Sequence, residues 1–131
     1  MIGALGSAGK AAKAPAMTAA PITIVFALFP GVTQLDFTGP LQVLARLPES
    51  AVHIIAKSDA PVPSDCGLGL VPTHTFANCP PLDLICIPGG NAGVVEAIGD
   101  RDTIQFVRRQ AATAKYVTSV CTGAYRGHVL R

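Results

Sequence analysis

The residue best suited to chemistry in this chain is Cys121, which stands between an apolar run at 116–120 and the pair Gly123-Ala124. If a helix begins there, the thiol faces unpaired N–H groups and the positive end of the helix dipole, which favour its nucleophilic thiolate form. The Cys-x-Gly spacing also resembles a nucleophile elbow, in which a small residue two positions later relieves crowding in the tight turn. The pattern therefore indicates that Cys121 is a nucleophile. The alternative is that it is a buried structural cysteine, which is the role that we expect of Cys86.

Two further stretches carry residue types that could assist such a nucleophile. Asp36 lies between Leu35 and Phe37, shortly after another apolar run. A carboxyl group in these surroundings suits a proton donor or acceptor, although an Asp between a strand and a helix more often caps the backbone. Gly89 and Gly90 end a third apolar run, where their N–H groups could stabilise negative charge that develops on a substrate. An ordinary turn explains the two glycines equally well.

The histidines and the other cysteines predict neither a metal site nor a Cys–His pair. Along a helix, His128 would lie about 10 Å from Cys121, which is too far for a direct contact. His53 falls in an apolar run and His74 in an irregular segment, so we expect both to be structural. The cysteine spacings match no zinc pattern, and we expect no metal and no cofactor. The partner of Cys121 nearest in sequence is therefore a hydroxyl, that of Thr122.

Four apolar runs predict the strands that position these residues, and they lie at 22–29, 52–56, 82–87 and 116–120. Thr38 is expected to cap a helix with Pro40 in its first turn, and Asp100 to cap another that runs to about residue 114. Short strands between 57 and 81 are expected to form a hairpin at one edge. Strands that alternate with helices predict an α/β fold with a doubly wound, mostly parallel sheet.

This fold would bring the candidate residues together. In a doubly wound sheet, ligands bind at the carboxyl ends of the strands. Asp36, the Gly89-Gly90 pair and Cys121 each follow a different predicted strand. Their convergence at one edge of the sheet is the main argument for a single active site.

Composition narrows the classes of partner. The chain has 131 residues, of which 50% are hydrophobic, enough for one domain with a core. Of its ten Lys and Arg residues, Lys10 and Lys13 fall in the first 20, which leaves eight basic against eight acidic residues in the remainder. A neutral body predicts no nucleic-acid partner, and the run at 22–29 is too short to cross a membrane. We expect a cytoplasmic protein with reduced cysteines.

The first 20 residues differ in character from the rest of the chain. They are rich in Ala and Gly, contain no acidic residue and show no periodicity. We expect a disordered or mis-annotated leader over residues 1–20, with Met17 as a plausible true start. The domain itself is expected over residues 21–131.

Three motifs together resemble a known family. They are FPGVTQLDFTGP at 29–40, PLDLICIPGG at 81–90 and AKYVTSVCTG at 114–123. In order and spacing they closely resemble the isonitrile hydratases, a branch of the ThiJ/PfpI superfamily. The resemblance implies a fold like that of the class I glutamine amidotransferases, which is flavodoxin-like, and it implies a homodimer.

The resemblance also implies a reaction and roles for residues. The reaction is the cofactor-free hydration of an isonitrile to an N-substituted formamide, catalysed by a lyase. Cys121 matches the nucleophile that attacks the isonitrile carbon and forms a thioimidate. Asp36 matches the acidic residue that handles protons and positions water, and Thr122 matches the hydroxyl beside the nucleophile. Gly89 and Gly90 match the backbone turn near the reacting centre.

The resemblance extends from about residue 22 to residue 124 and then stops. The family continues with an apolar helix and further strands, whereas residues 125–131 form an unrelated basic stretch. We therefore expect a truncated or frameshifted C-terminus and a domain that is incomplete there, which can leave the chain inactive. One alternative is the ligand-sensing domain of an AraC-type transcription regulator, and another is a non-functional fragment. The pairing of Asp36 with Cys121 favours the enzyme.

Overall fold

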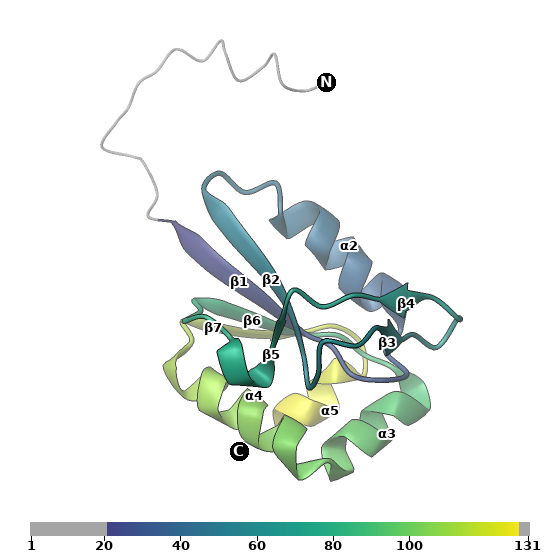
Figure 1. Ribbon diagram of the computed structural model, residues 1–131. Helices are drawn as coiled ribbons and strands as arrows, with labels where there is room; N and C mark the ends of the chain where they lie inside the picture. The colour runs from purple at the N-terminus through teal and green to yellow at the C-terminus, as the bar shows by residue number, and fades with distance from the viewer. Residues whose placement is uncertain (1–20, 129–131) are drawn as a thin grey trace, which may run out of the picture.

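One sheet of five strands forms the centre of the structure, a computed structural model that describes residues 21–128. The predicted leader at 1–20 lies outside the described residues. The strands are β1 (Ile22–Ala27), β2 (Ser50–Ala56), β5 (His74–Thr75), β6 (Leu84–Ile87) and β7 (Tyr116–Ser119). Their order is β5-β2-β1-β6-β7, and each pairing is parallel (Figure 1). The predicted parallel sheet is confirmed.

Helices cover both faces of this sheet. They are α2 (Gln34–Leu44), α3 (Asn91–Gly99), α4 (Arg101–Thr113) and α5 (Gly123–His128). Figure 1 shows α2 on one side of the sheet and α4 on the opposite side. None of the helices in the described part of the chain is long and apolar enough to cross a membrane. The sheet is doubly wound, as predicted.

The core follows from the alternation of side chains along β1. Ile24 and Phe26 pack in the same cluster as Phe37 of α2. Val25 and Ala27 belong to the other cluster, with Phe106 and Val107 of α4 as members. Because successive residues of a strand point to opposite faces, a continuous apolar run is the pattern that a doubly covered strand needs.

The predicted hairpin and the Asp100 helix are both present. Strands β3 (Val62–Pro63) and β4 (Gly69–Leu70) pair antiparallel in a separate two-stranded sheet. Asp100 caps α4, since its carboxylate accepts a hydrogen bond from the backbone N–H of Thr103 at 3.1 Å. The main sheet ends instead at β5, a strand of two residues that is followed by a 3-10 turn, Phe76–Asn78. Sequence reasoning missed β5 and α3.

Helix α2 begins earlier than predicted. Its N-cap is Thr33, not Thr38, and Pro40 lies inside the helix. The Thr38 hydroxyl donates to the Gln34 side chain at 3.0 Å, one turn back on the helix surface. Proline at this depth removes one helical hydrogen bond, whereas Phe37 of the same helix packs in the core. The shift places Asp36 in the first turn of the helix rather than in the loop before it.

Strand β7 has little cover from other elements. All four of its residues are exposed. One side of β7 pairs with β6, and none of the described strands pairs with its other side. An apolar composition predicts the strand but cannot show which faces are covered.

Candidate active site

Cys121 stands on a sharp turn between β7 and α5. Its φ of 52° lies in the left-handed region, which few residues other than glycine adopt. The Val120 N–H donates to the Ile87 carbonyl at 3.0 Å, and the Gly123 N–H donates to the Val120 carbonyl at 2.9 Å. These bonds hold the turn against the end of β6, and Cys121 itself is exposed. The geometry is that of a nucleophile elbow.

Gly123 explains the Cys-x-Gly spacing. It is buried, and a Cβ at this position would collide with the carbonyl oxygen of Ile87. Any larger residue would push the start of α5 away from β6. The spacing that was read from sequence therefore reflects close contact between the elbow and the neighbouring strand.

Asp36 reaches the same region from α2. Its backbone N–H donates to the Thr33 carbonyl at 3.0 Å. Its Oδ2 atom is buried and has no hydrogen-bond partner among the described residues. A buried carboxyl oxygen without a partner is costly, and such groups are characteristic of sites that bind a ligand or perform chemistry.

Gly89 is the point where the predicted residues meet. A Cβ on Gly89 would lie 2.7 Å from Asp36 Oδ2 and 2.8 Å from Thr122 Oγ1. The carboxylate from α2 and the hydroxyl beside Cys121 therefore approach one backbone position from two sides. The absence of a side chain at Gly89 is what allows this approach. The structure thus brings Asp36, Gly89 and Thr122 together, next to Cys121 in the chain.

Gly90 differs from its expected role as a free donor. Its N–H donates to Thr122 Oγ1 at 3.0 Å. The bond fixes the threonine side chain against the Gly89-Gly90 turn and uses the amide that was expected to meet a substrate. Sequence reasoning could not find this bond because the two residues are 32 positions apart.

The other thiols are less suited to chemistry than Cys121. Burial raises the pKa of the Cys86 thiol, and a hydrogen bond with Thr118 opposes this only in part. Burial likewise raises the pKa of Cys79. Cys66 is exposed, with its Sγ 3.4 Å from Ser64 Oγ in the β3–β4 turn. The structural role expected of Cys86 agrees with its position in β6.

The histidines described form a pair away from the elbow. The rings of His53 in β2 and His74 in β5 lie edge to face, with centroids 4.8 Å apart. Burial, and then the neighbouring His74, lower the pKa of His53. The side chain of His128 lies outside the described part of the chain. Among the described residues, no group of three or more His, Cys, Asp or Glu side chains could hold a metal ion.

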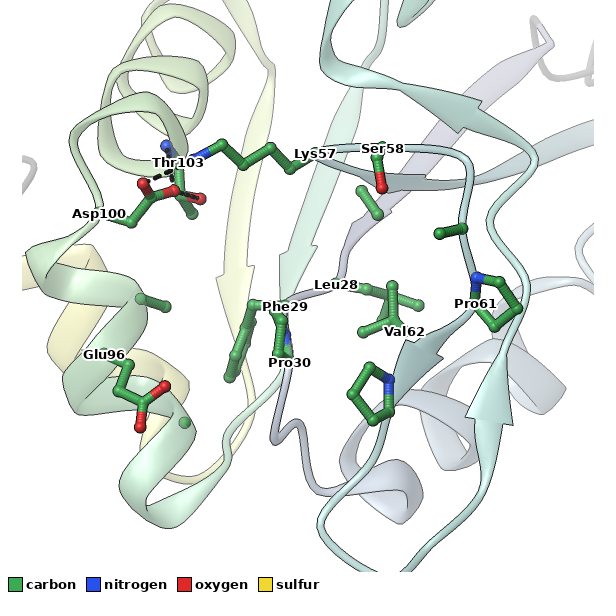
Figure 2. A pocket seen from close by; sticks show the side chains of 15 residues that line it. Leu28, Phe29, Pro30, Lys57, Ser58, Pro61, Val62, Glu96, Asp100 and Thr103 are labelled. Atoms are coloured by element: carbon green, nitrogen blue, oxygen red, sulfur yellow. Dashed lines mark hydrogen bonds and ion pairs between the residues drawn. The ribbon is translucent and has the colours of Figure 1, made fainter.

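The structure also contains a cavity of about 530 Å³ (Figure 2). The ends of β1 and β2, the segment before β3, and helices α3 and α4 line it, and most of its wall is apolar. Lys57 reaches across one end to Asp100, with Nζ 2.8 Å from the carboxylate. Asp36, Gly89 and Cys121 are not among its lining residues. Sequence reasoning did not find this cavity, because its wall combines three stretches that lie far apart in the sequence, at 28–30, 56–63 and 93–103.

A family model matches most of the chain. Residues 22–127 match the model of the DJ-1/PfpI family. This span contains the whole sheet, the elbow and the Asp36 helix.

Two proteins are similar to this chain in sequence. An isonitrile hydratase from Pseudomonas putida is 56% identical over 103 residues, which are 79% of this chain and 45% of that protein. An uncharacterised protein from the cpoL 5′ region of Streptomyces lividans is 32% identical over 114 residues, which are 83% of this chain and 79% of that protein. The chain therefore spans less than half the length of the hydratase that it matches.

Solved structures share the arrangement of the sheet and helices. A ThiJ/PfpI family protein from Pseudomonas syringae superimposes with a TM-score of 0.83 at 36% identity, over 92% of this chain and 52% of that one. DJ-1beta from Drosophila melanogaster has a TM-score of 0.73 at 16% identity, over 85% of this chain and 61% of that one, and supports the fold alone. The predicted flavodoxin-like α/β fold is confirmed.

Proposed function

Because this chain belongs to the DJ-1/PfpI family, we propose that it is an isonitrile hydratase-type lyase whose nucleophile is Cys121. The observation that carries the proposal is the approach of Asp36 Oδ2 and Thr122 Oγ1 to Gly89, directly beside the elbow. The relative with the same activity in its name is 56% identical over the matched span. The substrate is an isonitrile and water, and the product is an N-substituted formamide.

The proposed reaction has two stages. In the first, the Cys121 thiolate bonds to the isonitrile carbon, that carbon gains a proton from the carboxyl group of Asp36, and a thioimidate results. In the second, water adds to the same carbon, and one of its protons passes to the Asp36 carboxylate. The other proton of that water moves to the nitrogen as the carbon–sulfur bond breaks, so the formamide leaves and the thiolate is restored. Atoms balance, because one water is consumed for each isonitrile.

Each residue has a distinct task in this scheme. The left-handed turn presents the Cys121 thiol to solvent and substrate. The unpartnered Oδ2 of Asp36 is free to exchange a proton with the substrate carbon or with water. Thr122, oriented by the Gly90 N–H, places a hydroxyl on the other side of Gly89, where it can donate to the substrate nitrogen. The close approach of both groups depends on the bare backbone of Gly89.

We also propose that the protein is cytoplasmic and forms a homodimer. All four cysteines are free, which agrees with a reducing cytoplasm. Leu35 and Val43 expose large apolar side chains on α2, and such a surface suits the contact of a homodimer. Light scattering on the purified chain measures its oligomeric state directly. A monomer at micromolar concentration would contradict the proposed homodimer.

The test of the nucleophile is Cys121→Ser in the 131-residue chain. We expect hydration of an alkyl isonitrile, followed by formamide release, to fall at least about 10³-fold, because an alcohol is a far weaker nucleophile than a thiolate. The matched control is Cys66→Ser, which changes the other exposed thiol and should leave the rate unchanged. Retained activity in Cys121→Ser, or a wild-type chain without turnover, contradicts the proposal.

A further inference from the structure

Thr33 is bonded to three separate parts of the molecule. Its N–H donates to the Gly89 carbonyl at 2.9 Å, and its carbonyl accepts the Asp36 N–H at 3.0 Å. Its hydroxyl donates to Asp65 Oδ2, in the turn between β3 and β4, at 2.6 Å. One residue therefore joins the Gly89 turn, the helix that carries Asp36, and the hairpin.

The hydroxyl of Thr33 is used in an unusual way for its position. Thr33 is the N-cap of α2, and a threonine at this position normally accepts a hydrogen bond from an N–H of the first helical turn. Here the side chain makes no such bond. It donates instead to a carboxylate, which is a stronger, charge-assisted bond. The first turn of α2 therefore lacks a side-chain cap from Thr33, whose hydroxyl bonds instead to a residue 32 positions away in sequence.

The hairpin is well placed to hold this contact. The Asp65 N–H donates to the Val32 carbonyl at 2.9 Å, and the Gly31 N–H donates to the Pro63 carbonyl at 2.8 Å. These backbone bonds attach the hairpin to the loop that precedes α2. They fix Asp65 beside Thr33, so the side-chain bond between them restrains the start of α2 without having to hold the hairpin in place.

We propose that Thr33 and Asp65 are positioning residues that set the distance between Asp36 and Gly89 for the proposed reaction. The role in catalysis rests on the proposed function, whereas the restraint on the start of α2 does not. A rotation of Thr33 would shift both the Gly89 carbonyl contact and the Asp36 amide contact. Because Asp36 Oδ2 lies so near Gly89, a displacement of about 1 Å can lower a rate by about 100-fold.

The kinetic test compares Thr33→Val, Thr33→Ser and Asp65→Ala in the full chain. Valine keeps the shape of threonine but loses the donor, and serine keeps the donor. With an alkyl isonitrile, Thr33→Val and Asp65→Ala should lower kcat about 10- to 100-fold with KM within about twofold, and Thr33→Ser should restore most of the rate. The double variant Thr33→Val with Asp65→Ala should be no slower than either single variant, since both remove one bond.

The matched control is Thr73→Val. The Thr73 hydroxyl also bonds in an exposed segment, to the N–H and carbonyl of Ile54, but on the far side of β2. Its loss should leave kcat within about twofold of wild type. A fall in kcat equal to that of Thr33→Val would show a general effect of lost surface bonds and would overturn the inference.

A second measurement separates this inference from the proposed function. Amide hydrogen exchange should become at least about tenfold faster at positions 33 and 36 in Thr33→Val and Asp65→Ala, and stay unchanged at Val25. If the wild-type chain has no turnover, the proposed function fails, and the exchange rates alone decide whether the pair restrains α2. If both variants exchange at the wild-type rate, or if Thr33→Ser does not restore kcat in an active chain, the inference is wrong.

Discussion

Strands β1 and β7 both pair in parallel with β6, yet their surroundings are opposite. Ile24, Val25 and Phe26 of β1 are fully buried, whereas Tyr116 and Val117 of β7 are 56% and 45% exposed. The candidate active site spans this boundary. Its acid is on the helix that follows β1, and its thiol is on the turn that follows β7.

The two halves of the site are therefore held by different forces. Phe37, next to Asp36, packs edge to face on Phe26 with centroids 5.3 Å apart. Hydrophobic packing thus fixes the acid. The turn at Cys121 is fixed mainly by backbone bonds to β6 and by the close fit of Gly123. The candidate site thus combines an acid, Asp36, that is held by core packing with a nucleophile, Cys121, that is exposed.

The largest expected effect is the loss of core packing beneath Asp36. Phe26→Ala should lower the free energy of unfolding by about 3–5 kcal/mol, because it removes a fully buried ring and leaves a cavity. Val117→Ala in β7 is the comparison and should cost only about 0.5 kcal/mol, since that side chain is half exposed. Urea denaturation measures both. Similar losses of unfolding free energy in the two variants would mean that β1 and β7 contribute equally to stability.

A change at the junction of the two halves should have an intermediate effect. Gly89→Ala places a methyl group 2.7 Å from Asp36 Oδ2 and 2.8 Å from Thr122 Oγ1. We expect a cost of about 1–3 kcal/mol in unfolding and a loss of isonitrile hydration, because both side chains must move apart.

The matched control for this variant is Gly99→Ala. A Cβ at Gly99, the last residue of α3, meets no atom within 4 Å. Alanine there should leave the unfolding free energy unchanged or raise it by a few tenths of a kcal/mol, about what helix propensity allows. Denaturation and the hydration assay measure both variants. If the two alanine variants had equal unfolding free energies and equal hydration rates, Gly89 would not belong to the candidate site.

The smallest expected effect concerns α4, which packs on one of the two buried faces of β1. Hydrogen bonds from Lys57 and then Thr103 hold the pKa of Asp100 below its usual value, against a smaller opposing effect of burial. A carboxyl group with a lowered folded-state pKa stabilises the fold above its unfolded pKa, and that contribution is lost as the pH falls through the folded pKa. The stabilisation is therefore full at neutral pH and disappears in acid.

The test is Asp100→Asn, because asparagine can still cap α4 but carries no charge. At neutral pH and low salt we expect only a small loss of stability, since the ion pair with Lys57 is largely solvated and screened. The difference from wild type should vanish once the pH is below the folded pKa of Asp100. Asp102→Asn, which changes a more exposed carboxylate 3.2 Å from the same amine, should cost less. A difference that persists in strong acid would contradict a charge effect.

The elements that sequence reasoning placed well are those with a strong local pattern. The runs at 22–29 and 82–87 became β1 and β6 because a continuous apolar strand has few other stable environments. The α4 helix was predicted with its cap because Asp100 and the apolar spacing after it agree. Helix α2 was misplaced because Pro40 suggested a first turn, while the tertiary contact of Phe37 extends the helix on its N-terminal side.

For the candidate site, the sequence alone determined which residues could react. Cys121, Asp36, Thr122 and the Gly89-Gly90 pair follow from residue types, spacing and the rule that strand ends meet in a parallel sheet. The Cys-x-Gly spacing also predicted a small residue at position 123, and the structure gives the reason, since a Cβ there would collide with the carbonyl oxygen of Ile87 in β6.

Only the tertiary structure decided how these residues meet. The bonds of Thr122 to Gly90 and of Thr33 to Asp65 each join residues 32 positions apart, and no local pattern encodes them. The same holds for the exposure of β7, which depends on what packs against it rather than on its own apolar residues. Local sequence sets what a segment can form, whereas contacts between distant segments set which atoms face one another.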